Sequence, residues 1–365
     1  MSQKNHVKEP LVRIARRPSI YWAKAWGIRL VAIIAALVVD ALVIYCITKL
    51  NPLKVYVTMF EGAFGTNRRI WMTLREMMML LCIAVGLAPA FKMRFWNVGA
   101  EGQVLVGGIA TAACMIYLKN LPTVVMLVVM FVASAIAGAI WGLIPAIFKS
   151  RWDTNETLFT LMMNYVAIQL TSFMVAKWEN PYGSNSVGVI NQNTQAGWFP
   201  RIAGQQYLLN VILVLALTLA MYAYLKYSKQ GYEIAVVGES RNTARYAGID
   251  VKRVIVRTML ISGAVCGIAG MVGVAGADHT ISVNTAGGRG FTAIIVAWMA
   301  KFNTIVMTLI TALLVFLDRG AAEIASMYNL NEYASEMISG VILFFLLGCE
   351  FFINYRLVFR HKEGK

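Results

Sequence analysis

The sequence predicts an all-α polytopic membrane protein with about ten transmembrane helices, on the basis of its composition, its apolar runs and the placement of its basic residues. Of its 365 residues, 59% are hydrophobic and 14% are charged. The hydrophobic share is about 215 positions, and one helix that crosses a bilayer takes about 20. Soluble domains carry about a quarter charged residues, so a water-soluble enzyme is close to excluded.

Ten apolar runs follow one another along the chain, and we expect some of the helices to be broken. Glycine and polar residues interrupt an apolar region in each half, at Asn97–Gly108 and at Gly287–Gly290. Such interruptions are typical of an inverted repeat with a transport path at its interface. The eighth run is short enough to be half of a broken helix. The runs cover residues 30–48, 77–91, 102–118, 123–148, 157–176, 207–225, 258–277, 290–300, 304–317 and 337–353.

The basic residues predict the organisation of the chain across the membrane. We divide it into a basic N-terminal segment (1–29), a transmembrane domain (30–355) and a basic tail (356–365). Ten spans bring both ends to one side, and 23 of the 33 lysines and arginines then fall on segments assigned to the cytoplasm. By the positive-inside rule both termini are cytoplasmic. Within the first segment, Leu11–Trp26 interleaves basic and apolar residues, which predicts a helix lying in the interface.

Two connections stand out by their length. Residues 177–206 form a polar external loop that is rich in Asn, Gln and Gly and has room for short structure of its own. Residues 226–257 form its cytoplasmic counterpart.

Within the apolar runs, glycines provide small-residue faces that predict close helix packing. They are Gly138 and Gly142, then Gly263, Gly267, Gly270, Gly273 and Gly276.

Motifs of soluble catalysis are missing from the sequence. It contains no GxxxxGK[ST], GxSxG or HExxH motif, so we expect no cofactor or metal on this chain and no ATP hydrolysis by it. The basic residues are scattered between apolar runs, which argues against a nucleic-acid partner. His279 follows Asp278 in a turn that leaves a span. A solvated loop pair is the favoured interpretation of these two residues, with a proton relay as the alternative.

Ionisable groups inside apolar runs need an explanation, because a charge at the bilayer centre costs a few kcal/mol unless it faces protein or water. Asp40 either pairs with a basic residue of another helix or is a structural partner. Glu101 lies with Asn97 and Gln103 at a break between two apolar runs. These groups either bind a polar solute or satisfy the backbone where helices break. The other candidates are Glu76, Asp318 and Glu350.

The cytoplasmic connection contains a second constellation. Beyond Gly238 and Glu239, residues from Arg241 onward are compatible with a short helix, and Gly248 suits the left-handed position after a helix end. Such a helix would expose Ala244 and Ala247 beside Arg241 and Arg245. A rigid helix with a small-residue face is a good docking surface for a cytoplasmic partner. A solvated loop is the alternative.

Four segments in order carry a family resemblance. They read FWNVGAEGQ at Phe95–Gln103, NETLFTLMMNY at Asn155–Tyr165, VGESRNTARYAGI at Val237–Ile249 and GFTAIIVA at Gly290–Ala297. They resemble motifs of the permease subunits of bacterial ABC importers for nucleosides and simple sugars, in the larger group that includes ribose and branched-chain amino acid permeases. The resemblance extends over about residues 50–350.

The resemblance implies a permease subunit of an ATP-driven importer in the bacterial cytoplasmic membrane, which moves solute by alternating access. Nucleosides are the first choice of solute and simple sugars the alternative. An ion-coupled secondary transporter that uses Asp40, Glu101 or Asp318 is the rival interpretation, and a membrane-embedded enzyme has no catalytic set to recommend it. We expect the solute path near Asn97, Glu101, Gln103, Asn164 and Phe291.

The expected partners are separate ATPase subunits that hold ATP and Mg, an extracytoplasmic substrate-binding lipoprotein and a second, nonidentical permease. The ATPases would dock on residues 231–250, and the coupling residues would be Gly238, Glu239, Ala244, Arg245, Ala247 and Gly248. The family usually has Arg where Ala235 stands and Asn-Pro at Ser240-Arg241, which weakens the case for an ion pair to the ATPase from these positions. Near the eighth run, Ile295, Ala300 and Thr304 replace the usual Ala, Gly and Pro.

Overall fold

The computed structural model describes residues 12–16, 21–49, 51–331, 333, 337, 340–342, 344–345, 348, 351–353 and 355–359. These fall into two compact units, one made of residues 67–315 and the other of residues up to 66 and from 316 onward. Seven helices in the described part are long and apolar enough to cross a membrane, and two shorter apolar helical stretches cover residues 30–46 and 289–299. The protein is therefore a helical, multi-pass membrane protein.

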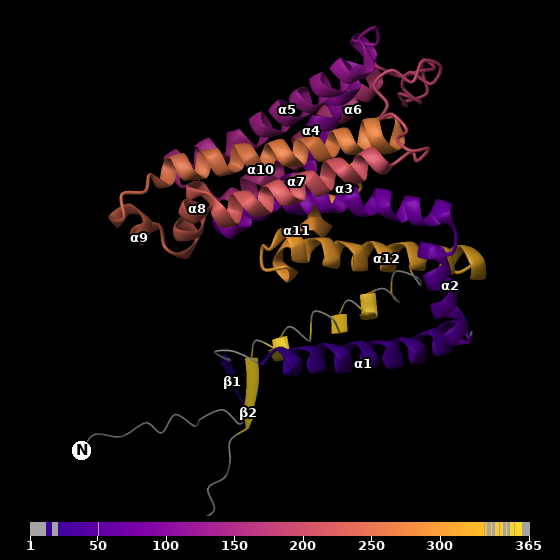
Figure 1. Ribbon diagram of the computed structural model, residues 1–365, viewed down its shortest axis with the longest axis vertical. Helices are drawn as coiled ribbons and strands as arrows, with labels where there is room; N and C mark the ends of the chain where they lie inside the picture. Colours follow the sequence, from indigo (N-terminus) through magenta and orange to yellow (C-terminus); the bar gives the residue numbers. More distant parts are fainter. Residues whose placement is uncertain are drawn as a thin grey trace, which may run out of the picture. The chain divides into compact units, whose positions relative to one another are not determined.

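A helix covers each apolar run from 30 to 317, although α3 begins 10 residues before its run and α12 ends 11 residues after its run. Figure 1 shows how the helices are arranged. Within the predicted run at 337–353, the described residues 337, 340–342, 344–345, 348 and 351–353 are helical. Two helices were not predicted: α2, and α8 in the cytoplasmic connection, where a helix was expected from Arg241 onward. The elements are β1 (Val12–Arg16), α1 (Trp22–Thr48), α2 (Pro52–Phe64), α3 (Asn67–Lys92), α4 (Ala100–Tyr117), α5 (Thr123–Trp152), α6 (Glu156–Lys177), α7 (Leu208–Tyr227), α8 (Lys229–Glu239), α9 (Arg241–Tyr246), α10 (Val251–Gly273), the π-helix η1 (Val274–Asp278), α11 (Arg289–Met299), α12 (Thr304–Tyr328) and β2 (Tyr355–Phe359).

A two-stranded antiparallel sheet joins the two ends of the chain in the first unit. Val12 pairs with Phe359 and Arg16 with Tyr355. The prediction of an interfacial helix over 11–26 was therefore wrong for residues 12–16, where alternating Val, Ile and Ala suit a strand. The pairing brings the N-terminal segment and the tail together.

In the same unit, α2 packs against the second half of α12. A Cβ atom added at Gly62 would lie 2.6 Å from the Glu323 side chain, and one added at Gly320 would lie 2.1 Å from the side chain of Met59. The Asn51 side chain caps α2 by accepting a hydrogen bond from the Leu53 N–H, and Pro52 occupies its first position. These are usual helix-start residues.

In the other unit α10 is the central helix, buried among α3, α4 and α5. A Cβ added at Gly263 would lie 2.3 Å from the Gly138 carbonyl oxygen of α5, and one added at Gly270 would lie 2.2 Å from the Val104 carbonyl oxygen of α4. Only glycine permits helices to approach so closely. The prediction that these glycines serve packing is confirmed.

The connection 178–207, which joins α6 to α7, packs onto the end of α4 and onto η1. The Ile190 N–H donates to the His279 carbonyl oxygen (2.8 Å) and the Phe199 N–H to that of Ala275 (3.1 Å). The Asn191 side chain donates to the Met115 carbonyl oxygen at 2.7 Å. Among its described residues, the regular secondary structure of this connection is a single β-bridge between Ile202 and Gln205.

Candidate solute path and coupling segment

The chain between α3 and α4 turns back into the unit at Asn97, which is fully buried. Its side-chain oxygen accepts the Gly99 N–H at 3.0 Å, and its amide donates to Gln103 (3.3 Å) and to Ser262 of α10 (3.4 Å). Because both ends of the amide are engaged, Asn97 fixes the course of the backbone where helices break.

Asn164 of α6 bridges the two sides of this break. Its side chain accepts the Gly102 N–H and donates to the Val98 carbonyl oxygen, both at 2.9 Å. Thr160, one turn earlier, accepts the Val98 N–H at 3.1 Å. The predicted amide residues are thus brought together, and they bind one another and the backbone.

Glu101 connects the break to the start of α11. Its two carboxylate oxygens accept the N–H groups of Gly288 (2.7 Å) and Gly290 (2.8 Å). A carboxylate at a helix N-terminus satisfies orphan N–H donors and interacts favourably with the helix dipole. Arg289, between the two glycines, forms an ion pair with Glu76 of α3. Glu101 therefore holds the start of α11 to the start of α4.

α11 is a half-helix with one exposed face. Its 11 residues span about 16 Å, about half the hydrocarbon core of a bilayer. This confirms the expected break. Phe291, Ile295 and Trp298 lie at helical spacing and are 45–46% exposed, whereas Asn97, Glu101, Gln103 and Asn164 are at most 7% exposed. Among the five predicted path residues, Phe291 alone offers much surface to a solute.

The exposed face of α11 ends at an aromatic hollow. Trp298 stacks on Trp96, with ring centroids 5.1 Å apart, and both rings approach Phe91. The hollow has a volume of about 510 Å³, and Arg94 and Glu239 also line it. An aromatic face with both charges nearby can stack a flat ring and accept or donate hydrogen bonds at its edge.

The coupling segment consists of two helices, each started by a serine. The Ser228 hydroxyl accepts the Gly231 N–H at the start of α8, and Ser240 accepts the Thr243 N–H at the start of α9. Serine favours this position because its oxygen satisfies a free N–H of the first turn. The segment is therefore helical and not a solvated loop.

α9 ends as the sequence predicts. Gly248 has φ +75°, the Ile249 N–H donates to the Ala244 carbonyl oxygen (2.9 Å) and the Gly248 N–H to that of Arg245 (3.0 Å). These two hydrogen bonds define a Schellman turn, in which glycine meets the left-handed residue without strain.

The surface of the coupling segment differs in one respect from the prediction. Ala247 and Arg245 are exposed, but Ala244 is completely buried and so cannot belong to an exposed face. Glu239 is exposed. Gly238 is buried against the end of α3, where an added Cβ would lie 2.1 Å from the Lys92 carbonyl oxygen. The segment is thereby seated on α3.

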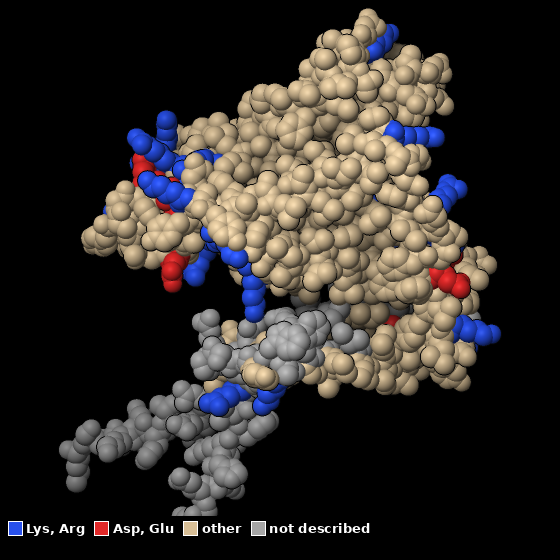
Figure 2. Space-filling view, in the orientation of Figure 1, with Lys and Arg blue, Asp and Glu red and all other residues tan. Residues whose placement is uncertain are grey.

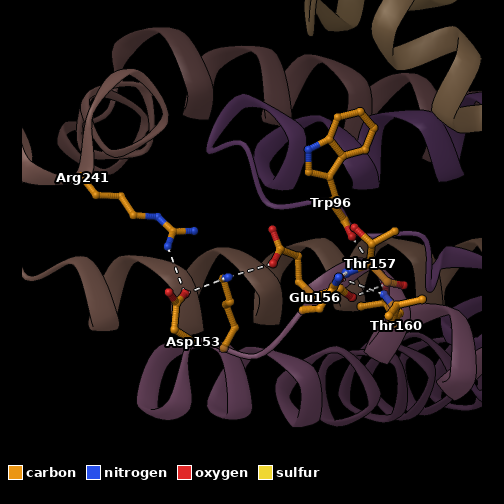
Figure 3. A network of polar contacts seen from close by, with 9 residues as sticks. Trp96, Asp153, Glu156, Thr157, Thr160 and Arg241 are labelled. Carbon is orange, nitrogen blue, oxygen red and sulfur yellow. Dashed lines mark hydrogen bonds and ion pairs between the residues drawn. The ribbon is translucent and has the colours of Figure 1, made fainter.

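A polar network connects α9 to the break (Figure 3). Arg241 pairs with Asp153 at the α5–α6 turn (3.3 Å), and Lys149 contacts both Asp153 (2.7 Å) and Glu156 (2.9 Å). The hydrogen bond from Lys149 lowers the pKa of Asp153. Thr160 donates to the Glu156 carbonyl oxygen at 2.7 Å and reaches the backbone of the break, where it accepts the Val98 N–H.

The remaining ionisable candidates take other roles. The favoured interpretation of His279 as a solvated residue was wrong, because it is 9% exposed and stacks on Trp198 with centroids 3.8 Å apart. Asp40 is buried, and its carboxylate oxygens have no hydrogen-bond partner among the described residues. Asp318 is exposed. Glu350 lies outside the described residues.

Sequence reasoning missed the partners that these groups find. Asp153 and Arg241 are 88 positions apart, and no local pattern links them. Arg289 carried a usable signal, since an arginine between two glycines at the start of an apolar run needs an acidic partner, and Glu76 was already a candidate. Trp96 and Trp298 gave no signal, because isolated tryptophans are common in membrane helices.

The sequence matches a protein family described as "Branched-chain amino acid transport system / permease component" over residues 69–347. It is 28% identical over 322 residues to the guanosine ABC transporter permease protein NupP of Bacillus subtilis, which covers 87% of this chain and 91% of the relative. For the glucose ABC transporter permease protein TsgB13 of Haloferax volcanii, identity is 26% over 344 residues, or 91% and 90% of the two chains.

A third relative, the nucleoside ABC transporter permease protein NupB of Lactococcus lactis, is 25% identical over 306 residues. The alignment covers 81% of this chain and 84% of the relative. The matched region contains both the break and the coupling segment.

Proposed function

Since the chain belongs to the family of permease components of branched-chain amino acid transport systems, we propose that it forms part of the membrane path of an ATP-driven nucleoside importer. The names of two similar proteins, a guanosine and a nucleoside permease, support nucleosides as the solute. The chain is a transport subunit, and ATP and Mg would bind to separate ATPase chains. An extracytoplasmic receptor would deliver the solute.

The observation that carries this proposal is the exposed aromatic face of the half-helix α11. A nucleoside has an aromatic base, and a transient path for it needs aromatic surface without tight binding. Phe291 and Trp298 supply that surface at one and the same helix face. The path would follow this face toward the hollow at Trp96.

The four polar residues of the predicted path, Asn97, Glu101, Gln103 and Asn164, would then act behind this surface. Because they are buried and hydrogen-bonded to one another or to backbone, they would hold the break and the start of α11 in position. Phe291 would be the residue that touches solute. The half-saturating solute concentration would depend on the receptor, so a change in the path should alter the maximal rate.

The test is nucleoside uptake by the assembled importer in proteoliposomes. Phe291→Ala and Trp298→Ala should lower the maximal rate severalfold while the half-saturating concentration stays the same. Phe173→Ala is the matched control, because Phe173 is 63% exposed on α6 and lies outside this face. Normal maximal rates per assembled complex in both α11 variants would contradict the path.

Two substitutions distinguish a role of Glu101 in positioning α11 from direct contact with the solute. If Glu101 positions α11, Glu101→Ala removes the acceptor of the buried Gly290 N–H, which costs about 1–3 kcal/mol, and that of the partly buried Gly288 N–H, so the yield of complex falls. Glu101→Gln keeps one acceptor oxygen and should recover part of the yield, with normal uptake per complex. A lower uptake per complex for Glu101→Gln at full yield would instead indicate contact with solute.

For coupling, we propose that an ATPase subunit docks on the exposed side of α8 and α9, with Glu239, Arg245, Ala247 and Gly248 at the contact. Gly238 and Ala244 would seat the segment on the unit. Movement of α9 would reach the break through a series of five residues, which are Arg241, Asp153, Lys149, Glu156 and Thr160. The support for this route is the unbroken series of polar contacts, since alternating access needs a physical link between the two sites.

Two variants test this coupling. Ala247→Trp should abolish copurification of the ATPase through steric clash, with membrane insertion unchanged. Asp153→Asn should leave docking intact and lower the solute-stimulated rate of ATP hydrolysis, and adding Arg241→Gln should cause little further loss because both groups act in one network. Additive losses, or normal stimulation in Asp153→Asn, would exclude the route.

The orientation and the second permease complete the proposal. Lysines and arginines gather at the end of the unit that carries α8 and α9 (Figure 2), which supports a cytoplasmic location of that end. The topology with ten spans would place both termini on the same side. A single cysteine at position 242 that reacts with an impermeant reagent in intact cells would overturn it. The partner permease would be nonidentical, so copurification of two differently tagged copies of this chain would contradict that assignment.

A simple sugar is the second candidate solute, favoured by the similarity to a glucose permease over most of both chains. Aromatic rings also stack on sugar faces, so α11 alone does not distinguish the two solutes. A competition experiment distinguishes them, in which unlabelled uridine or unlabelled glucose is tested for its ability to reduce the uptake of labelled guanosine. For an ATP-driven importer, uptake should persist when the proton and sodium gradients are collapsed and ATP remains. Loss of uptake under these conditions would favour an ion-coupled secondary transporter.

A further inference from the structure

A second hollow, of about 310 Å³, lies where the end of α3, the end of α7 and the turn between α11 and α12 meet. Three lysines line it, one from each of these elements: Lys92, Lys226 and Lys301. Tyr222, Asn303 and Thr304 also contribute. None of the side chains that line it, all in the described part of the chain, is acidic. The hollow therefore concentrates positive charge beside hydrogen-bonding groups.

Neutral partners hold two of these ammonium groups at the hollow. Lys92 donates to the Leu225 carbonyl oxygen at 3.0 Å, and Lys226 donates to the Tyr222 hydroxyl at 2.8 Å. The Lys226 ammonium group also lies 5.1 Å from the ring centroid of Tyr222 and 5.3 Å from that of Tyr227. Neutral acceptors orient an ammonium group without cancelling its charge, so both groups remain able to attract an anion.

Apolar surface leads away from the hollow along two membrane helices. A hydrogen bond from Thr304 of α12 to the Thr218 carbonyl oxygen of α7 joins the helices at 3.3 Å. Next to these two residues, Leu219 is 61% and Ile305 is 45% exposed, and Leu309, one turn further along α12, is 70% exposed. A ligand that fits both regions has an anionic head and apolar chains.

We propose that this hollow binds the headgroup phosphate of an anionic phospholipid, whose acyl chains lie along α7 and α12. Tyrosines at the end of α7 agree with a location at the membrane interface, where aromatic side chains gather. Basic pockets between membrane helices on the cytoplasmic side are suited to anionic headgroups. The bound lipid would tie the turn after α11 to the ends of α3 and α7.

The test uses the importer complex, purified and reconstituted in phosphatidylcholine with or without phosphatidylglycerol, with retained lipid measured by native mass spectrometry. Phosphatidylglycerol should be retained over phosphatidylcholine. Lys226→Gln with Lys301→Gln should weaken retention about thirtyfold, since each lysine near an anionic headgroup strengthens binding about fivefold. Lys226→Arg with Lys301→Arg should retain the lipid.

The matched control is Lys177→Gln with Arg201→Gln, which removes the same charge from exposed positions at the ends of the 178–207 connection. An equal loss in this control would overturn the site, as would equal retention of the two lipids by the unmodified complex. Displacement of the lipid by inorganic phosphate alone would assign a free-anion site instead. Loss of ATPase copurification in the glutamine variant with lipid retained would assign a protein contact. If the double variant does not assemble, the exposed Lys226→Gln alone carries the same comparison.

Discussion

The two longest connections of residues 67–315 meet their helices in opposite ways. The connection 178–207 has almost no regular structure, yet Ile190 and Phe199 are buried against α4, α5 and η1. The connection 228–250 is almost entirely helical, yet Tyr246 is 93% exposed. The first is irregular chain that is packed against its neighbours, and the second is helical chain with one exposed side.

The difference shows that polarity alone does not tell a packed, irregular connection from an exposed, helical one. Both segments are polar in sequence. In the first, the apolar anchors around Trp198 and Phe199 lie among residues that satisfy the backbone, so that irregular chain can be buried. In the second, serine caps and a glycine end form helices locally, and Ile234, Val237 and Ala244 anchor one side of them while the other side stays exposed. Each of the following predictions separates the two connections further.

The largest effect is expected at the buried anchor. Phe199→Ala should lower the free energy of unfolding by about 3–5 kcal/mol, because it removes a large side chain and leaves a cavity. Tyr246→Ala should change it by less than about 0.5 kcal/mol, as is usual for exposed positions. Thermal denaturation of the purified protein measures both. Similar losses in the two variants would mean that the connections do not differ in packing.

Much of the fold could be predicted, because membrane helices are encoded locally. The apolar runs, the half-helix at 289–299 and the glycine end of α9 all follow from neighbouring residues. The start of α2 was encoded as well, at Asn51-Pro52, but Lys54 and Glu61 interrupt its apolar pattern and so it was missed.

Contacts between distant segments could not be predicted. They include the pairing of β1 with β2, the ion pair of Arg241 with Asp153, and the bonds from Glu101 to the start of α11. For the same reason the sequence could not say that the side chains of Asn97 and Asn164 both hydrogen-bond to the backbone of the break, at residues 98–102. Which groups a polar side chain meets depends on tertiary packing.

A pair of glycines within the coupling segment distinguishes its seated side from its free side. Gly238→Ala should cost about 3 kcal/mol, at the upper end for overpacking, because its Cβ would meet the Lys92 carbonyl oxygen at 2.1 Å. Gly248→Ala meets nothing within 4 Å and should cost only about 1 kcal/mol, from its left-handed backbone. Thermal denaturation again ranks them, and equal losses would contradict the contact of α8 with α3.

The smallest effect is a pH dependence of the folding stability at the connection 178–207. It is absent at neutral pH. Burial lowers the pKa of His279, which stacks on Trp198. In the unfolded chain its pKa is about 6.5, so as the pH falls through that value the unfolded state takes up a proton before the folded state does. The stability of the folded state therefore decreases from pH 7.5 toward pH 5. His279→Phe keeps a ring against Trp198 and removes the titration, so its melting temperature should depend less on pH over this range. An unchanged pH dependence in His279→Phe would show that another group is responsible. His279 would then contribute to the packing of the 178–207 connection only through its ring.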